Sequence, residues 1–168
     1  METPLTEHIK TGRPPLAIND YEMVGGYYAV SKALKMIPSD IIELVKSSKL
    51  SGRGGAGFST GLKWSLVPKE SIGDRYLIAN ADEMEPGTFK DRYLLEGNPH
   101  QLIEGMIIAS YAIQAQKAYI FLRWAYKDAE TILRKAISDA YDAGYLGKNI
   151  LGSGYNLDIY VHSSAGRY

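Results

Sequence analysis

Apolar positions along the chain predict three buried strands separated by two helices. Short apolar runs over residues 76–79, 117–123 and 157–162 are typical of strands buried within a sheet. Residues 127–141 repeat apolar side chains every three or four positions, which indicates a helix with one buried face. Residues 102–113 are apolar nearly all round and follow Pro99, so they predict a buried helix. This alternation predicts an α/β fold with right-handed crossovers and a mainly parallel sheet.

The chain before these elements divides into two parts. Residues 1–25 are polar and rich in proline, which favours an extended amino-terminal arm, and residues 26–168 are predicted to form the α/β domain. Within that domain, residues 27–36 have a helical composition that ends before Pro38. A second helix is predicted over residues 40–48. Ser39 is its expected N-cap, and Asp40 lies favourably in its first turn.

Residues 51–65, SGRGGAGFSTGLKWS, follow this second helix and form the most unusual stretch of the sequence. Glycine permits a positive φ and a close approach of the main chain to a ligand, because no Cβ intervenes. Successive exposed N–H groups in such a loop can bind an anion. Two cations and an aromatic ring accompany the glycines. The candidate ligand-binding residues are Gly52, Arg53, Gly54, Gly55, Ala56, Gly57, Phe58 and Lys63.

The glycine stretch does not match the standard phosphate-binding motifs. GRGGAG satisfies G-x-G-x-x-G, but the dinucleotide fingerprint must follow a strand, and a predicted helix precedes it here. Leu62 separates Gly61 from Lys63, which excludes a Walker loop. A tight loop with a purely structural role is the alternative interpretation.

Residues 79–92, ANADEMEPGTFKDR, place Asn80, Asp82, Glu83 and Glu85 directly after the first predicted strand. Ligands of parallel sheets bind beyond the carboxyl ends of the strands, so this loop is well placed for binding. A solvated surface loop is the alternative, although the Pro-Gly pair at 86–87 favours a defined shape. Together the two stretches suit a nucleotide with a phosphate, a sugar or ribityl chain and a hydrogen-bonding ring.

Composition narrows the possible functions. The 168 residues carry no net charge, so general attraction to nucleic acid or to an anionic membrane is not indicated. Without cysteine the chain holds no disulfide and no iron–sulfur ligand, and its three scattered histidines give no reason to expect a metal site. No apolar run approaches the roughly 20 residues of a membrane span, and the amino terminus resembles no targeting peptide. A cytoplasmic location is the default expectation.

Both central stretches are similar to a known family, the NADH-binding flavoprotein subunit of bacterial respiratory complex I. The same module recurs in NAD-dependent formate dehydrogenases and NAD-coupled hydrogenases. The resemblance covers essentially the whole chain, from PLTEHI and GGYYAVSKAL through the two central stretches to NPHQLIEGMIIASYAI, AYIFLR and VHSSAGRY.

The resemblance implies a Rossmann-like domain that binds FMN and NAD(H) and transfers a hydride from NADH to FMN. It places Arg53, Gly54, Gly55 and Lys63 at the FMN site, with Lys63 near the flavin phosphate or NADH. It gives Asn80, Asp82 and Glu83 hydrogen bonds to the flavin and its ribityl chain. It places Phe58 on the adenine of NADH and gives Glu85 the catalytic position beside the nicotinamide. The family has Arg-Gly-Glu-Tyr where this chain has Arg123-Trp124-Ala125-Tyr126, and an aromatic residue where it has Leu66.

Electrons would then pass to iron–sulfur clusters outside this chain. The family carries a [4Fe–4S] cluster on a carboxyl-terminal domain that is absent here, and the last predicted strand runs directly into SSAGRY, so we expect a carboxyl-terminally truncated fragment. The implied partners are other subunits of an NADH dehydrogenase complex, including an iron–sulfur subunit. They would hold the protein at the cytoplasmic face of the inner membrane without inserting it.

Two alternatives stay open. Within the family, the chain could be the diaphorase subunit of a soluble formate dehydrogenase or hydrogenase. From a different functional class, it could be a nucleotide-binding or assembly module that does not reduce flavin.

Overall fold

The computed structural model describes residues 3–10, 12–68, 70 and 73–166, and it has a parallel sheet at its centre. Its three strands, β1 (Tyr76–Ala81), β2 (Lys117–Arg123) and β3 (Asp158–Ser164), lie side by side in chain order. Ala81 pairs with Leu122, and Arg123 pairs with Ser164, so the carboxyl ends of the strands meet at one edge. The predicted α/β fold with a parallel sheet is confirmed.

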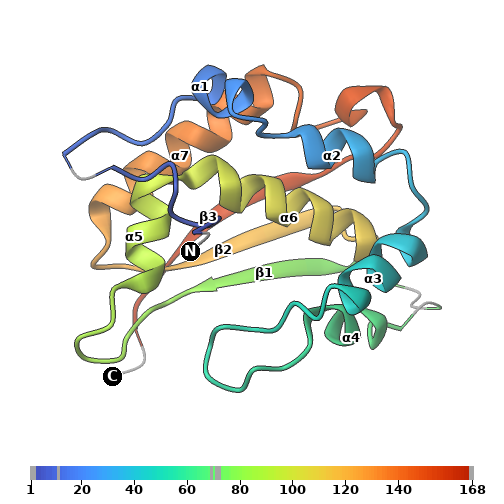
Figure 1. The fold of residues 1–168 in the computed structure, drawn as a ribbon, viewed down its shortest axis with the longest axis horizontal. Helices are drawn as coiled ribbons and strands as arrows, with labels where there is room; N and C mark the ends of the chain where they lie inside the picture. Colours follow the sequence, from blue (N-terminus) through green and yellow to red (C-terminus); the bar gives the residue numbers. More distant parts are fainter. Residues whose placement is uncertain (1–2, 11, 69, 71–72, 167–168) are drawn as a thin grey trace.

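Three helices cover one face of this sheet, as Figure 1 shows. They are α5 (Lys90–Gly97), α6 (Pro99–Ile113) and α7 (Lys127–Asp142). Strands in sequential order with right-handed crossovers must carry their connecting helices on the same face, which explains the arrangement. Residues of α6 and α7 such as Ile103, Ile107 and Leu133 form the core together with Ile120 and Leu122 of β2.

The opposite face of the sheet carries aromatic side chains that are partly or fully exposed. Tyr119 stacks on Tyr160 with ring centroids 5.4 Å apart, and Phe121 stacks on His162 at 5.5 Å. Alternating burial along β2 follows from its alternating side-chain directions, since every second residue points into the helical layer.

Two shorter helices, α3 (Pro38–Ser47) and α4 (Thr60–Ser65), pack together beside the main core. A Cβ on Gly61 would lie 2.4 Å from the main-chain nitrogen of Lys46, so only glycine allows this approach. Trp64 packs against the buried residues Ile41 and Ala112. The predicted N-cap was wrong: Pro38 is the first residue of α3, with Ile37 as the N-cap, because proline suits that position.

The amino-terminal part is more ordered than an extended arm over residues 1–25 implies. Residues Ile18–Met23 form α1, and the ring of Tyr21 is buried edge-on against Tyr27, which precedes α2 (Tyr28–Ala33). The division into an arm and a domain over residues 26–168 stays a prediction. Short helices such as α1, α4, α5 and the 3₁₀ turn Ile150–Gly152 were not predicted because they span too few turns to show a period.

The end of the quoted carboxyl-terminal motif, Arg167 and Tyr168, lies outside the described residues. Within the described part of the chain, no helix has both the length and the apolar character needed to cross a membrane.

Candidate functional site

The glycine stretch forms a loop that is fixed at its base and exposed along its length. The Gly52 N–H donates to the Phe58 carbonyl at 2.8 Å, and the Thr60 N–H donates to the Leu50 carbonyl at 2.9 Å. Every residue from 52 to 58 between these bonds is exposed. In Figure 1 the loop leaves α3, runs toward the carboxyl end of the sheet and returns to α4.

Two glycines of this loop are required by the backbone conformation, and a third is not. Gly55 and Gly57 have φ values of 106° and 61°, which other L-residues rarely adopt. Gly54 has no positive φ, and a Cβ placed on it would meet no atom within 4 Å. The fold therefore does not require glycine at position 54. Close approach of a ligand to the main chain is a physical reason for its presence there.

The two cations of this stretch, Arg53 and Lys63, are exposed at the loop and in the last turn of α4. Among the residues that the structure describes, neither side chain makes a hydrogen bond or an ion pair. Both charges are thus available to an anionic ligand. Phe58 is 48% exposed and belongs to neither apolar core, so its ring is available for stacking.

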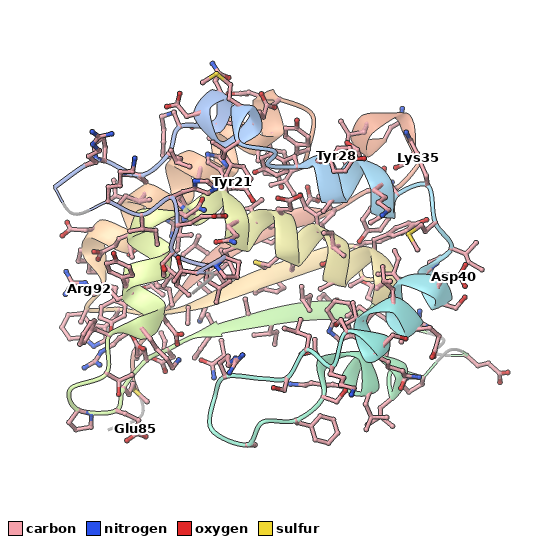
Figure 2. The ribbon with its side chains drawn as sticks, viewed as in Figure 1. Tyr21, Tyr28, Lys35, Asp40, Glu85 and Arg92 are labelled. Atoms are coloured by element: carbon pink, nitrogen blue, oxygen red, sulfur yellow. The ribbon has the colours of Figure 1, made fainter. Side chains whose placement is uncertain are left out.

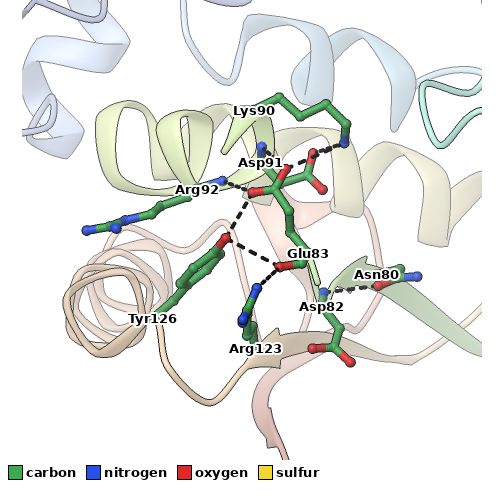
Figure 3. Close-up of polar contacts among 8 residues, drawn as sticks. All are labelled: Asn80, Asp82, Glu83, Lys90, Asp91, Arg92, Arg123 and Tyr126. Carbon is green, nitrogen blue, oxygen red and sulfur yellow. Dashed lines mark hydrogen bonds and ion pairs between the residues drawn. The ribbon is translucent and has the colours of Figure 1, made fainter. Parts of the chain in front are cut away.

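The loop after β1 is built differently, around the buried carboxylate of Glu83 (Figure 3). This carboxylate accepts hydrogen bonds from the N–H groups of Asp91 at 3.0 Å and Arg92 at 3.2 Å. Those are unpaired donors in the first turn of α5, so Glu83 acts as an N-terminal cap supplied from another segment. Lys90 adds an ion pair at 3.9 Å.

Arg123 at the end of β2 and Tyr126 just before α7 complete this network. Arg123 Nη1 donates to the Glu83 carbonyl at 2.5 Å, and the Tyr126 hydroxyl donates to the Glu83 carboxylate at 3.1 Å. Burial, and then the negative charge of Glu83, raise the pKa of Tyr126, so its hydroxyl stays protonated as a donor. The loop after β1 is therefore tied both to α5 and to the end of β2.

Asp82 and Asn80 lie at the end of β1, beside this network. One carboxylate oxygen of Asp82, Oδ2, accepts from the Ser164 hydroxyl at 3.1 Å, and Asn80 Oδ1 accepts from the Asp82 N–H at 3.0 Å. The other carboxylate oxygen, Asp82 Oδ1, is buried and has no hydrogen-bond partner among the described residues. A buried acceptor of this kind needs a donor, and the hydroxyl or ring N–H of a nucleotide fits that requirement.

Glu85 lies farther out on the same loop. It is exposed, and Figure 2 shows it at the turn below the end of β1, away from the helical layer. Its carbonyl accepts from the Thr88 N–H at 3.1 Å, and Gly87 at φ 78° completes the turn. This position reaches solvent, as a contact to a bound substrate requires.

The structure brings the predicted site residues together as two groups. Asn80, Asp82 and Glu83 lie together at the strand ends, with Glu85 on the same loop, whereas the residues of the glycine loop form a separate exposed group. Glu83 differs from a free ligand-binding carboxylate, because its side chain is only 2% exposed and its oxygens accept three hydrogen bonds. Its predicted contact with FMN therefore stays a prediction.

Sequence reasoning missed Arg123, Tyr126 and Ser164 as parts of this site. Of these, only Arg123 could have been placed, because the strand of residues 117–123 was predicted with its correct bounds. Leu122 pairs with Ala81 in the parallel register, so Arg123 follows beside the loop that leaves β1 and donates there to the Glu83 carbonyl.

Comparison with known proteins assigns this arrangement to a family. Residues 45–168 match the Nuo51 FMN-binding domain, and the chain belongs to that family. The chain is 52% identical over 167 residues to the F subunit of the NADH-quinone oxidoreductase of Escherichia coli and 53% identical over 169 residues to that of Aquifex aeolicus. These alignments cover 98% and 99% of the chain, but only 38% and 39% of the two relatives.

A solved structure shows the same fold. A chain of an NAD⁺-reducing [NiFe]-hydrogenase, in its H₂-reduced state, superposes with a TM-score of 0.70 at 32% identity. The match covers 92% of this chain and 26% of the hydrogenase chain.

Proposed function

We propose that this chain is the FMN- and NADH-binding module of an NADH dehydrogenase flavoprotein. Membership of the Nuo51 FMN-binding domain family is the observation that carries the proposal. Three features of the chain support it: the exposed glycine loop with its two cations, the buried oxygen of Asp82 that lacks a hydrogen-bond partner among the described residues, and the exposed position of Glu85.

Each group of residues binds a different part of the two nucleotides in this proposal. Arg53, Lys63 and the main chain of the glycine loop hold the phosphate, because this loop combines positive charge with open approach. Asn80 and Asp82 accept hydrogen bonds from the ribityl chain or the ring. FMN, when bound, supplies an isoalloxazine ring that can accept a hydride. Phe58 stacks on the adenine of NADH.

Glu85 orients the nicotinamide, and Glu83 fixes the loop that presents it. Alignment of the two rings is the main task of the protein in such a transfer, and no protein acid–base pair is needed.

Electrons leave this chain for iron–sulfur clusters outside it in this proposal, since the chain has no cysteine to hold one. Other subunits of an NADH dehydrogenase complex, including an iron–sulfur subunit, would hold the protein at the cytoplasmic face of the membrane. The likeness to an NAD⁺-reducing hydrogenase supports the second candidate, the diaphorase subunit of a soluble enzyme. A nucleotide-binding module that does not reduce flavin is the third.

Anaerobic titration with FMN, followed by NADH, tests the proposal. We expect saturable quenching of flavin fluorescence and then bleaching of the flavin absorbance by NADH. Quenching without bleaching would favour the non-catalytic module, and absence of quenching would contradict the FMN site.

The same assay tests Glu85. Glu85→Gln should slow the bleaching while FMN affinity stays unchanged, because Glu85 is exposed and lies on the turn beyond Asn80 and Asp82. Glu43→Gln, at an exposed glutamate of α3, is the matched control and should change neither step. Loss of FMN binding with a normal rate in the remaining loaded protein would point to another residue.

A further inference from the structure

A cavity of about 350 Å³ lies beyond the ends of all three strands. Each strand end contributes two lining residues: Met84 and Pro86 from the loop after β1, Arg123 and Trp124 at the end of β2, and Ala165 and Gly166 after β3. Ligands of parallel sheets bind at this edge. The volume falls at the lower end of the range of ligand pockets, which is roughly 300–1,000 Å³.

Trp124 supplies a flat wall of this cavity. Its side chain is 54% exposed, while its main-chain N–H donates to the Ser164 carbonyl at 3.2 Å and so extends the pairing of β2 with β3. The backbone under the indole is thus fixed, while the residue keeps about half of its surface accessible.

The indole and the thioether of Met84 border the same narrow space. A Cβ built on Gly166 would lie 3.9 Å from two atoms of the Trp124 ring and 3.8 Å from Met84 Sδ. Indole and thioether are both polarisable, and both make favourable contacts with aromatic rings. The ammonium of Lys127 lies over the same indole, 5.9 Å from the centre of the ring.

We propose that Trp124 is a further binding residue, which stacks on the planar heteroaromatic ring of the bound nucleotide at the strand ends. The ring is that of FMN or that of the nicotinamide nucleotide, and both are planar and polar. The inference rests on the proposed function and adds to it a residue outside both central stretches. It also places the ring beside Glu85, which lies between Met84 and Pro86 in the sequence.

Two variants and one reporter test this role in the full chain. Trp124→Ala removes the ring, and Trp124→Phe keeps a ring in place. We expect the alanine variant to raise the Kd roughly five- to tenfold, since this is the affinity that one stacking ring contributes. The Kd of the phenylalanine variant should stay within about twofold of the wild-type value, because a ring remains in place. FMN is titrated first, and NAD⁺ is then titrated into the FMN-loaded protein.

The reporter uses the fact that the chain has only two tryptophans. In a Trp64→Phe background Trp124 is the single indole, so its fluorescence should be quenched by the ligand at the same Kd that flavin fluorescence gives. This measurement leaves Trp124 intact and does not depend on the folding of the alanine variant.

The outcomes separate the ligands and the two proposals. A weakened FMN affinity assigns the flavin ring to Trp124, and a weakened NAD⁺ affinity with unchanged FMN affinity assigns the nicotinamide nucleotide. Wild-type binding of both ligands, with variants unchanged and Trp124 emission unaffected, would overturn the role of Trp124 alone. Failure of the wild-type chain to bind either ligand would overturn the proposed function together with it.

Discussion

The two loops that form the candidate site are held in opposite ways. The loop after β1 is fixed along its length by a buried carboxylate, a guanidinium, a tyrosine hydroxyl and the first turn of α5. The glycine loop is fixed at its base and exposed from residue 52 to residue 58.

This difference matches the demands of the two halves of a nucleotide. A ring and its ribityl chain need hydrogen-bond partners at set positions, which a preorganised wall provides without further loss of entropy on binding. A phosphate is recognised by charge and by main-chain N–H groups, and a loop with few fixed contacts can close around it. Substitutions in the loop after β1 should therefore change the stability of the fold, and substitutions in the glycine loop should change ligand binding.

Removal of the buried carboxylate should have the largest effect. Glu83→Ala leaves the N–H groups of Asp91 and Arg92 and the Tyr126 hydroxyl without their acceptor, so we expect a loss of about 2–4 kcal/mol in the free energy of unfolding. Urea denaturation followed by circular dichroism measures this loss. Glu43→Ala, at an exposed glutamate, should change stability by less than about 0.5 kcal/mol. Equal effects of the two variants would show that Glu83 does not hold the loop.

The next effect should fall on binding alone. Lys63→Ala removes an exposed charge of the glycine stretch, and we expect it to weaken nucleotide binding by about 1.5–3 kcal/mol while unfolding stays unchanged. Titration with FMN and with NADH measures both affinities. Lys35→Ala, an exposed lysine that follows α2, is the control and should alter neither. Unchanged affinities for both ligands in the Lys63 variant would refute its assignment.

The third test compares two glycines of the same stretch. Gly61→Ala places a methyl group 2.4 Å from the Lys46 nitrogen, so α4 must move from α3, at a cost of about 1–3 kcal/mol in stability. Gly54→Ala meets no neighbour and should leave stability within about 0.5 kcal/mol, but weaken FMN binding by obstructing close approach. Thermal unfolding and FMN titration of both variants check the contrast. Normal FMN binding by the Gly54→Ala variant would contradict the expected contrast between the two glycines.

Much of the fold could be predicted from the sequence. The bounds of β2 follow from its apolar run between charged residues, and α7 follows from its regular apolar period. Alternation of strands and helices along the chain then fixes a parallel sheet, because crossovers are right-handed. The loop after β1 had to lie at the carboxyl edge of that sheet, so its polar residues could be proposed as a site from the sequence alone.

Tertiary structure alone decided what each polar residue does. Asp82 and Glu83 are adjacent acids in the sequence. Within the part of the chain that the structure describes, Asp82 keeps one buried oxygen without a partner, while the carboxylate of Glu83 accepts hydrogen bonds from α5 and Tyr126. Their roles depend on partners 8 to 82 residues away in the chain. Local composition determines which groups a loop can offer. Long-range packing determines which of them stay free for a ligand, because a hydrogen-bonding group already paired within the fold is no longer available to bind.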